Sequence, residues 1–200
     1  MPIVTPEEFV VAFNHAAREF DLSGAAVANW EQLGHTVERA DGLPRLQPMK
    51  TADLTALVED KVVPSIAGLL HLRMEPQFRV PRDDGRGCKL DDVFLDPESN
   101  DLVVAWEFEN HIVNTVEDEV GNLRSVDAPL KVLVTCLRPY GDDNPDEWLG
   151  RYARAYANVP KGRQTTGTFL VIFSLPDGQW SFHEYAGADA EAIGFRTVRA

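Results

Sequence analysis

The sequence predicts an α/β protein in which helices flank a central mixed β-sheet. Its 200 residues are 44% hydrophobic, enough for a substantial core, and fit a single domain over residues 1–200. The run PLKVLVTCL, residues 129–137, is apolar at nearly every position, which is typical of a strand buried on both faces by helices. Segments with helical and with strand periodicity are also mixed along the chain, which favours a sheet covered by helices.

The N-terminal part is expected to open with a helix. The segment TPEEFVVAFNHAAREF has acidic residues in its first turn and apolar residues at helical spacing. The helix should therefore begin at Thr5 or Pro6 and end near Asp21. Residues 34–49 are polar and contain glycine and proline, so we expect a loop there.

A second helix is predicted over TADLTALVEDKVVPSIAGLL, with Thr51 as its cap. Pro64 lacks the N–H group that a continuous helix uses for hydrogen bonding, so we expect it to kink or split this run. Glu59 lies near the middle of the predicted helix.

Three strands and a short helix should follow. Strands are predicted over residues 74–80, from residue 89 or 90 to residue 95, and over VVAWEFEN, residues 103–110. The polar turn segments RDDGRG and DPESND separate them. The acidic segment NTVEDEVGNLRS, residues 114–125, has apolar residues at helical spacing and predicts a helix.

The rest of the chain adds one helix and two strands after the apolar strand at residues 129–137. Pro145 opens the predicted helix PDEWLGRYARAYANV. The strands GTFLVIFSL and QWSFHEYA are joined by Pro176, Asp177 and Gly178, which indicate a turn.

The charge balance bears on the partners. A net charge of -13 and an isoelectric point near 4.7 weigh against tight nucleic-acid binding by the chain alone, because affinity for phosphate depends on clustered Lys and Arg. Any affinity for nucleic acid should therefore be weak without help from a protein partner or from a second subunit in a homo-oligomer.

The sequence has no apolar window of about 18 residues, the length needed to cross a membrane, and its start does not resemble an export signal. We therefore expect a soluble cytoplasmic protein that does not bind membranes. Cys88 and Cys136 are far apart, and no Cys/His spacing indicates a zinc site.

The most informative segment is the strand VVAWEFEN, because it ends with two carboxylates on one face. Side chains alternate along a strand, so Glu107 and Glu109 share a face while Val104, Trp106 and Phe108 point to the core. Two glutamates about 7 Å apart repel each other unless a cation lies between them. The alternative is that both are solvated, or paired with arginines, at the open end of the strand.

A hairpin around DPESND would place a third carboxylate beside them. If Leu95 pairs with Leu102, then Asp92 pairs with Ala105 and shares the face of Glu107 and Glu109. A slip of one residue would substitute Asp91 for Asp92. Carboxylate oxygens without nitrogen or sulfur ligands suit Mg²⁺ or Mn²⁺, which activate water and stabilise charge on phosphate.

This arrangement resembles the PD-(D/E)XK nuclease superfamily. The shared pattern is an acid in a short strand, a hairpin, an apolar strand ending in acid-x-acid, a helix and a further buried strand. The resemblance implies a restriction-endonuclease-like αβββαβ core over residues 51–138. Residues 1–50, with the N-terminal helix, and residues 139–200, with the last helix and hairpin, would be additions to this core.

The resemblance also implies roles for individual residues. Asp92 and Glu107 would bind the metal, and Glu109 would be a further ligand or the base that activates water. Glu59 resembles the helical acid found in part of the superfamily. The family usually has lysine where Glu109 stands; Lys131 is either a substitute cation or a surface lysine whose ammonium reaches solvent.

The function implied is metal-dependent phosphodiester hydrolysis, with DNA as the favoured substrate, by a nuclease or by a catalytically weakened relative. The alternative is a non-catalytic acidic binding protein, such as an immunity-type partner of a basic nuclease or toxin, because negative charge steers association toward cationic surfaces. His111, directly after the acidic strand, would either serve the site or belong to a loop or helix cap.

Overall fold

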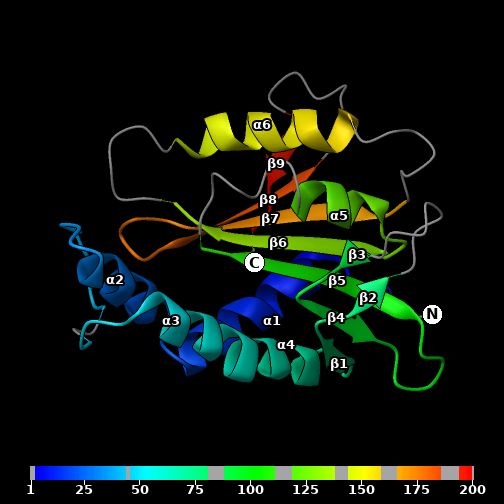
Figure 1. The fold of residues 1–200 in the computed structure, drawn as a ribbon, viewed down its shortest axis with the longest axis horizontal. Coiled ribbons are helices and arrows are strands. Elements are labelled where there is room, and N and C mark those ends of the chain that lie inside the picture. The colour runs from blue at the N-terminus through cyan, green and yellow to red at the C-terminus, as the bar shows by residue number, and fades with distance from the viewer. Residues whose placement is uncertain are drawn as a thin grey trace.

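A computed structural model describes residues 3–43, 46–80, 88–110, 119–137, 144–158, 166–185 and 194–199. Its centre is a seven-stranded mixed sheet with helices on both faces, as Figure 1 shows, so the predicted α/β class is confirmed. The helical segments are α1 Pro6–Glu19, α2 Leu22–Gln32, α3 Thr51–Leu57, η1 Val58–Val62, α4 Val63–Leu69, α5 Glu119–Ser125 and α6 Pro145–Asn158. The strands are β1 Arg73–Pro76, β2 Arg79–Val80, β3 Cys88–Lys89, β4 Asp92–Leu95, β5 Leu102–Glu109, β6 Leu130–Cys136, β7 Thr168–Ser174, β8 Trp180–Tyr185 and β9 Phe195–Thr197.

The first predicted helix is confirmed as α1. Thr5 and Glu8 form a reciprocal capping box, in which the Glu8 N–H donates to the Thr5 hydroxyl at 3.2 Å and the Thr5 N–H donates to the Glu8 carboxylate at 2.9 Å. Helix α2 was not predicted; the Asp21 side chain caps it by accepting from the Gly24 N–H. Most residues of α2 are buried, so it lacks the polar face by which an amphipathic helix is found.

The second predicted helix is divided into three segments, as expected from Pro64. One π-helical segment, η1, lies between α3 and α4, and the Val63 N–H donates to the Val58 carbonyl across it. Glu59 lies in this segment. The predicted cap is wrong by one residue, because Lys50 holds the cap position and Thr51 is the first helical residue.

The sheet combines antiparallel and parallel pairs in the order β1-β4-β5-β6-β7-β8-β9. Strands β5, β6 and β7 are parallel, and the other neighbours are antiparallel. The strand predicted over residues 74–80 is interrupted at Gln77, whose φ is 50°, so β2 leaves the main sheet and pairs with β3. Strand β9 was not predicted.

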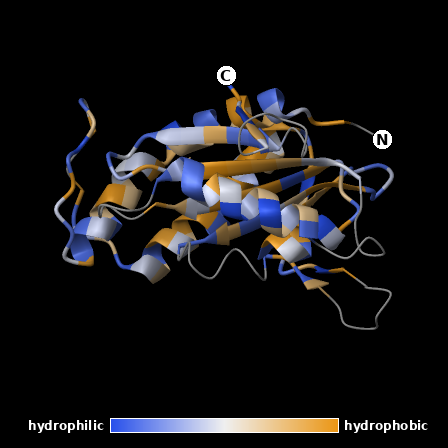
Figure 2. Cartoon of the chain, turned by 90° about the horizontal axis from the view of Figure 1, so that it is seen from above, coloured by the Kyte–Doolittle hydropathy of each residue, from blue (hydrophilic) through white to orange (hydrophobic). Residues whose placement is uncertain are grey.

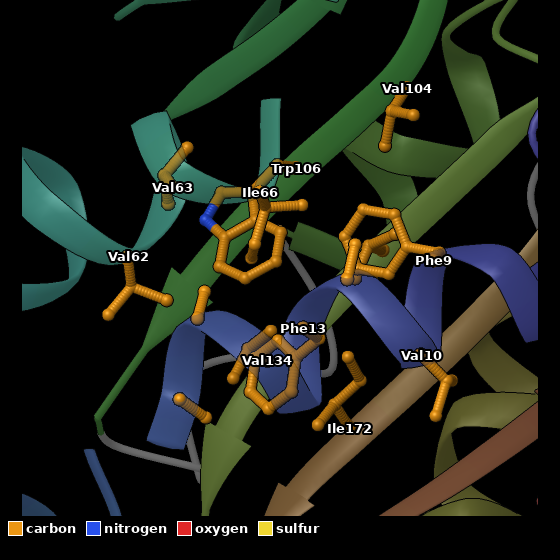
Figure 3. Close-up of a cluster of buried hydrophobic side chains, with 14 of the residues drawn as sticks. Phe9, Val10, Phe13, Val62, Val63, Ile66, Val104, Trp106, Val134 and Ile172 are labelled. Carbon is orange, nitrogen blue, oxygen red and sulfur yellow. The ribbon is translucent and has the colours of Figure 1, made fainter. Parts of the chain in front are cut away.

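Each face of the sheet has its own core. On one face Phe9 and Phe13 of α1 lie 6.0 and 6.4 Å from the Trp106 ring, measured between centroids, and Figure 3 shows this cluster with Ile66 of α4. On the other face the α5 and α6 side chains cover the sheet, among them Leu123 and Tyr152. All residues of β6 are buried, as its apolar sequence predicted, and Figure 2 shows long hydrophobic stretches along the strands. In the described ranges, none of the helices has the length and apolarity to cross a membrane.

Candidate carboxylate site

A β-bulge decides which acids meet at the start of β4. Leu95 pairs with Leu102 as predicted, but β5 then has one extra residue, so Phe94 pairs with Val104 and Asp92 with Trp106. The predicted pairing of Asp92 with Ala105 is therefore wrong. The one-residue slip that the sequence left open is the arrangement found, and it turns Asp92 to the face of Trp106.

Asp91 takes the place beside Glu107 that was expected for Asp92. The Asp91 N–H donates to Glu107 Oε2 at 3.3 Å, and Asp91 Oδ2 accepts from the Phe108 N–H at 2.9 Å. The two carboxyl groups also share a side-chain hydrogen bond. Such a bond between two carboxyl groups requires one proton, and this proton is displaced if a cation binds the pair.

Glu107 is a buried acid whose acidic neighbours make its ionised form still less favourable. Its side chain is 4% exposed, and Oε1 has no hydrogen-bond partner in the structure as described. Burial raises the pKa of Glu107 to about 9, and the Asp91 and Glu119 carboxylates raise it further than burial alone would. This raised pKa favours the protonated form of Glu107 at neutral pH.

Asp92 lies on the opposite face of the sheet, the face of Trp106. It is 2% exposed, and burial, followed by Asp91 and Glu59, raises its pKa to about 7. Partial burial and the nearby Asp91 and Asp60 carboxylates also raise the pKa of Glu59, while Lys89 lowers it. Asp92 thus does not converge with Glu107 and Glu109, although the Asp91 carboxylate raises the pKa of Asp92, of Glu59 and of Glu107.

Glu109 and Thr135 continue the site along the carboxyl ends of the parallel strands. Glu109 is half-buried at the end of β5, on the face of Glu107, and its partner in the parallel register is Thr135 of β6. Thr135 is fully buried, and its hydroxyl has no hydrogen-bond partner in the part of the chain that the structure describes. Thr135 was not predicted as a site residue, although its hydroxyl within an otherwise apolar run was a signal that could have identified it.

Lys131 lies at the other end of the same sheet face. It pairs with Ala105, two residues before Glu107, and its ammonium donates to the Thr166 carbonyl at 2.7 Å. Lys131 is 0% exposed, so the expectation that it reaches solvent is wrong. Burial, together with Arg124, lowers the pKa of Lys131 to about 8, while Asp127 opposes that shift. Its hydrogen bond to Thr166 does not direct it to the carboxyl pair.

The donor set at the pair is compatible with a hard divalent cation. Asp91 and Glu107 offer carboxylate oxygens only, and Glu107 Oε1 is a buried acceptor that lacks a donor. Within the described residues, no group of three or more His, Cys, Asp or Glu is arranged to hold a metal. A cation would thus require movement of Glu109 or Glu119, or ligands from water. His111 lies outside the described residues.

Comparison with known proteins finds no family model that matches the chain and no curated protein that matches its sequence. The function is therefore inferred from the chemistry of the Asp91 and Glu107 carboxyl groups.

Proposed function

We propose that the protein is a metal-dependent nuclease of the PD-(D/E)XK type, or a catalytically weakened relative of one. The observation that carries the proposal is the buried Asp91–Glu107 pair, in which one glutamate oxygen has no partner and the groups that shift its pKa most are other acids. A buried acceptor left unsatisfied costs about 1–3 kcal/mol, which a bound cation would offset.

The arrangement of secondary structure supports this class. The segments α3 to α4 precede an antiparallel meander of β1, β4 and β5, and α5 then leads to β6, which is parallel to β5. This order resembles the αβββαβ core of the superfamily. In this proposal Asp91, not Asp92, takes the role of the acid that precedes the hairpin.

Asp91 and Glu107 would hold Mg²⁺ or Mn²⁺. When bound there, such an ion lowers the pKa of a coordinated water and stabilises negative charge on a phosphodiester. The Phe108 N–H keeps the Asp91 carboxylate in place, because it donates to Oδ2. Glu109, next on the same face, would accept the proton of the attacking water or complete the ligand set.

The proposed substrate is DNA, bound with the help of another chain. The net charge of -13 opposes close approach of a polyanion, and Glu109 stands where the family usually supplies a lysine. A protein partner or a second subunit would therefore provide the cations that contact the phosphate backbone.

The test compares the wild-type protein with Glu107→Gln, after chelation and then with millimolar Mn²⁺. We expect Mn²⁺ to raise the melting temperature of the wild type and to support cleavage of plasmid or single-stranded DNA, because a ligand that binds only the native state stabilises it. Glu107→Gln, which matches the shape of the neutral acid, should fold but lose both responses. A wild-type protein that neither gains stability with Mn²⁺ nor cleaves DNA contradicts the proposal.

The second candidate is a non-catalytic acidic protein that binds a basic protein. The excess of 32 acidic over 19 basic residues favours it, since such charge accelerates association with cationic surfaces. This candidate predicts no response to Mn²⁺ and no effect of Glu107→Gln on complex formation. Binding of a basic protein that weakens steeply with salt, by a chain that ignores Mn²⁺, would favour it over the nuclease.

A further inference from the structure

Thr135 is a buried hydroxyl at a position where an apolar residue would fit as well. Every residue of β6 is buried, and Thr135 is 0% exposed within it. Its hydroxyl has no hydrogen-bond partner in the described structure, although elsewhere in the chain the Thr55 hydroxyl donates to the Thr51 carbonyl at 3.1 Å. An unsatisfied buried hydroxyl lowers stability, so its presence requires an explanation outside the apo fold.

The register of the sheet places Thr135 beside the proposed site. Thr135 pairs with Glu109 in the parallel register, and Leu133, two residues earlier on the same face of β6, pairs with Glu107. Leu133 packs in the core that α5 and α6 cover, and side-chain alternation places Thr135 on that face too. Thr135 is thus next to the carboxyl-bearing end of β5.

A threonine hydroxyl can donate one hydrogen bond and accept two. Carboxylates only accept hydrogen bonds, so next to them the hydroxyl of Thr135 would act as a donor. A carboxylate that coordinates a metal is usually held by a hydrogen bond from a neighbouring group, and this bond fixes its orientation.

We propose that Thr135 is a positioning residue for the cation site: its hydroxyl donates to the Glu109 carboxylate when a divalent cation is bound. The inference rests on the proposed function, because it assigns a role to Thr135 only within a site that binds the cation. Among the described residues the Thr135 hydroxyl has no partner without metal. It gains an acceptor when the cation binds, so the lost stability of the metal-free protein and the gained metal affinity have the same origin.

The experiment uses the full chain and three variants. Thr135→Val replaces the hydroxyl with a methyl group of nearly equal size, Thr135→Ser keeps the hydroxyl, and Thr168→Val makes the same change at the far end of the neighbouring strand β7. Mn²⁺ affinity is measured by titration calorimetry, and the melting temperature is measured after chelation.

We expect Thr135→Val to bind Mn²⁺ about tenfold or more weakly than the wild type, in the range found for groups that orient metal ligands. Without metal its melting temperature should equal or exceed that of the wild type, by up to about 2–4 °C. Thr135→Ser should keep wild-type affinity, and so should Thr168→Val.

Three results overturn the inference, and they differ in whether the nuclease proposal also fails. If the wild type and Thr135→Val bind Mn²⁺ equally, Thr135 has no positioning role while the nuclease proposal stands. If the wild type binds no Mn²⁺, both proposals fail together. A loss of affinity in Thr135→Val that Thr135→Ser does not restore also overturns it, because the hydroxyl is then not the cause.

Discussion

Lys131 is a buried base and Glu107 a buried acid on one face of the same sheet, but their surroundings differ. Lys131 donates to the Thr166 carbonyl at 2.7 Å and lies near the acidic Asp127. Glu107 keeps one oxygen without a partner in the described structure, and Asp91 is the largest charged influence on its pKa.

This difference in hydrogen-bond partners distinguishes a charge that stabilises the fold, at Lys131, from a binding site that still lacks a ligand, at Glu107. A buried charge is tolerated when hydrogen bonds and an opposite charge replace its hydration. Lys131 has a carbonyl acceptor and an acid nearby, so it belongs to the fold. Glu107 avoids the cost of a buried negative charge by binding a proton, and a cation could replace that proton.

The largest expected effect is on Lys131. Lys131→Ala removes a long buried side chain and leaves the Thr166 carbonyl without its donor, so we expect a loss of about 2–5 kcal/mol in the free energy of unfolding. Urea denaturation measures this. Mn²⁺-dependent stabilisation of the folded fraction should persist; its disappearance would mean that Lys131 serves the acidic site after all.

The next effect distinguishes the two neighbouring aspartates. Asp91→Asn should weaken Mn²⁺ binding about 10- to 100-fold, because Asp91 faces Glu107, while its amide oxygen can still accept from the Phe108 N–H. Asp92→Asn is the matched control, since Asp92 points to the opposite face, and its affinity should change little. Equal losses in both variants would argue against the bulged register as the determinant of the site.

A smaller effect concerns stability without metal. Glu107→Gln removes the need for a shared proton, so at pH 8 we expect it to match the wild type or to exceed it by about 1–2 kcal/mol. The measurement is urea denaturation after chelation. A large loss of stability would place Glu107 with Lys131 as a residue that the fold requires.

A separate prediction concerns the pH dependence of stability, which should have opposite signs at the two residues. The pKa of Glu107 is about 9 in the folded protein and 4.5 in its ordinary state, so the folded chain holds an extra proton between these values and loses stability as pH rises through them. The pKa of Lys131 is about 8 against an ordinary 10.5, so the unfolded chain holds the extra proton and stability rises from pH 8 to 10.5.

Glu107→Gln should remove the fall, and Lys131→Met should remove the rise, when unfolding free energies are compared across pH with the wild type. The pKa of Asp92 is also raised. Asp92 is present in the wild type and in both variants, so its contribution to the pH dependence cancels when each variant is compared with the wild type. Unchanged slopes in either variant would show that its residue does not titrate as described.

The elements of the fold followed from local patterns where those patterns were complete. Helix α1 has its capping box and amphipathic period in the sequence, and β6 is recognisable as a run that two helical layers must cover. Helix α2 was not recognisable in this way, because most of its residues are buried and no polar face reveals its period. Short strands such as β9 carry too few residues for a pattern.

By itself, the sequence determined that an acidic strand end would follow a hydrophobic strand and that an aspartate would meet it across a hairpin, because side-chain alternation and turn residues are local properties. Only the tertiary structure decided which aspartate. One extra residue in β5 reverses the face of every side chain beyond it in β4, and the bulge depends on packing between strands and helices. Packing likewise decided the environment of Lys131, since a lysine is buried only when a distant segment supplies its acceptor.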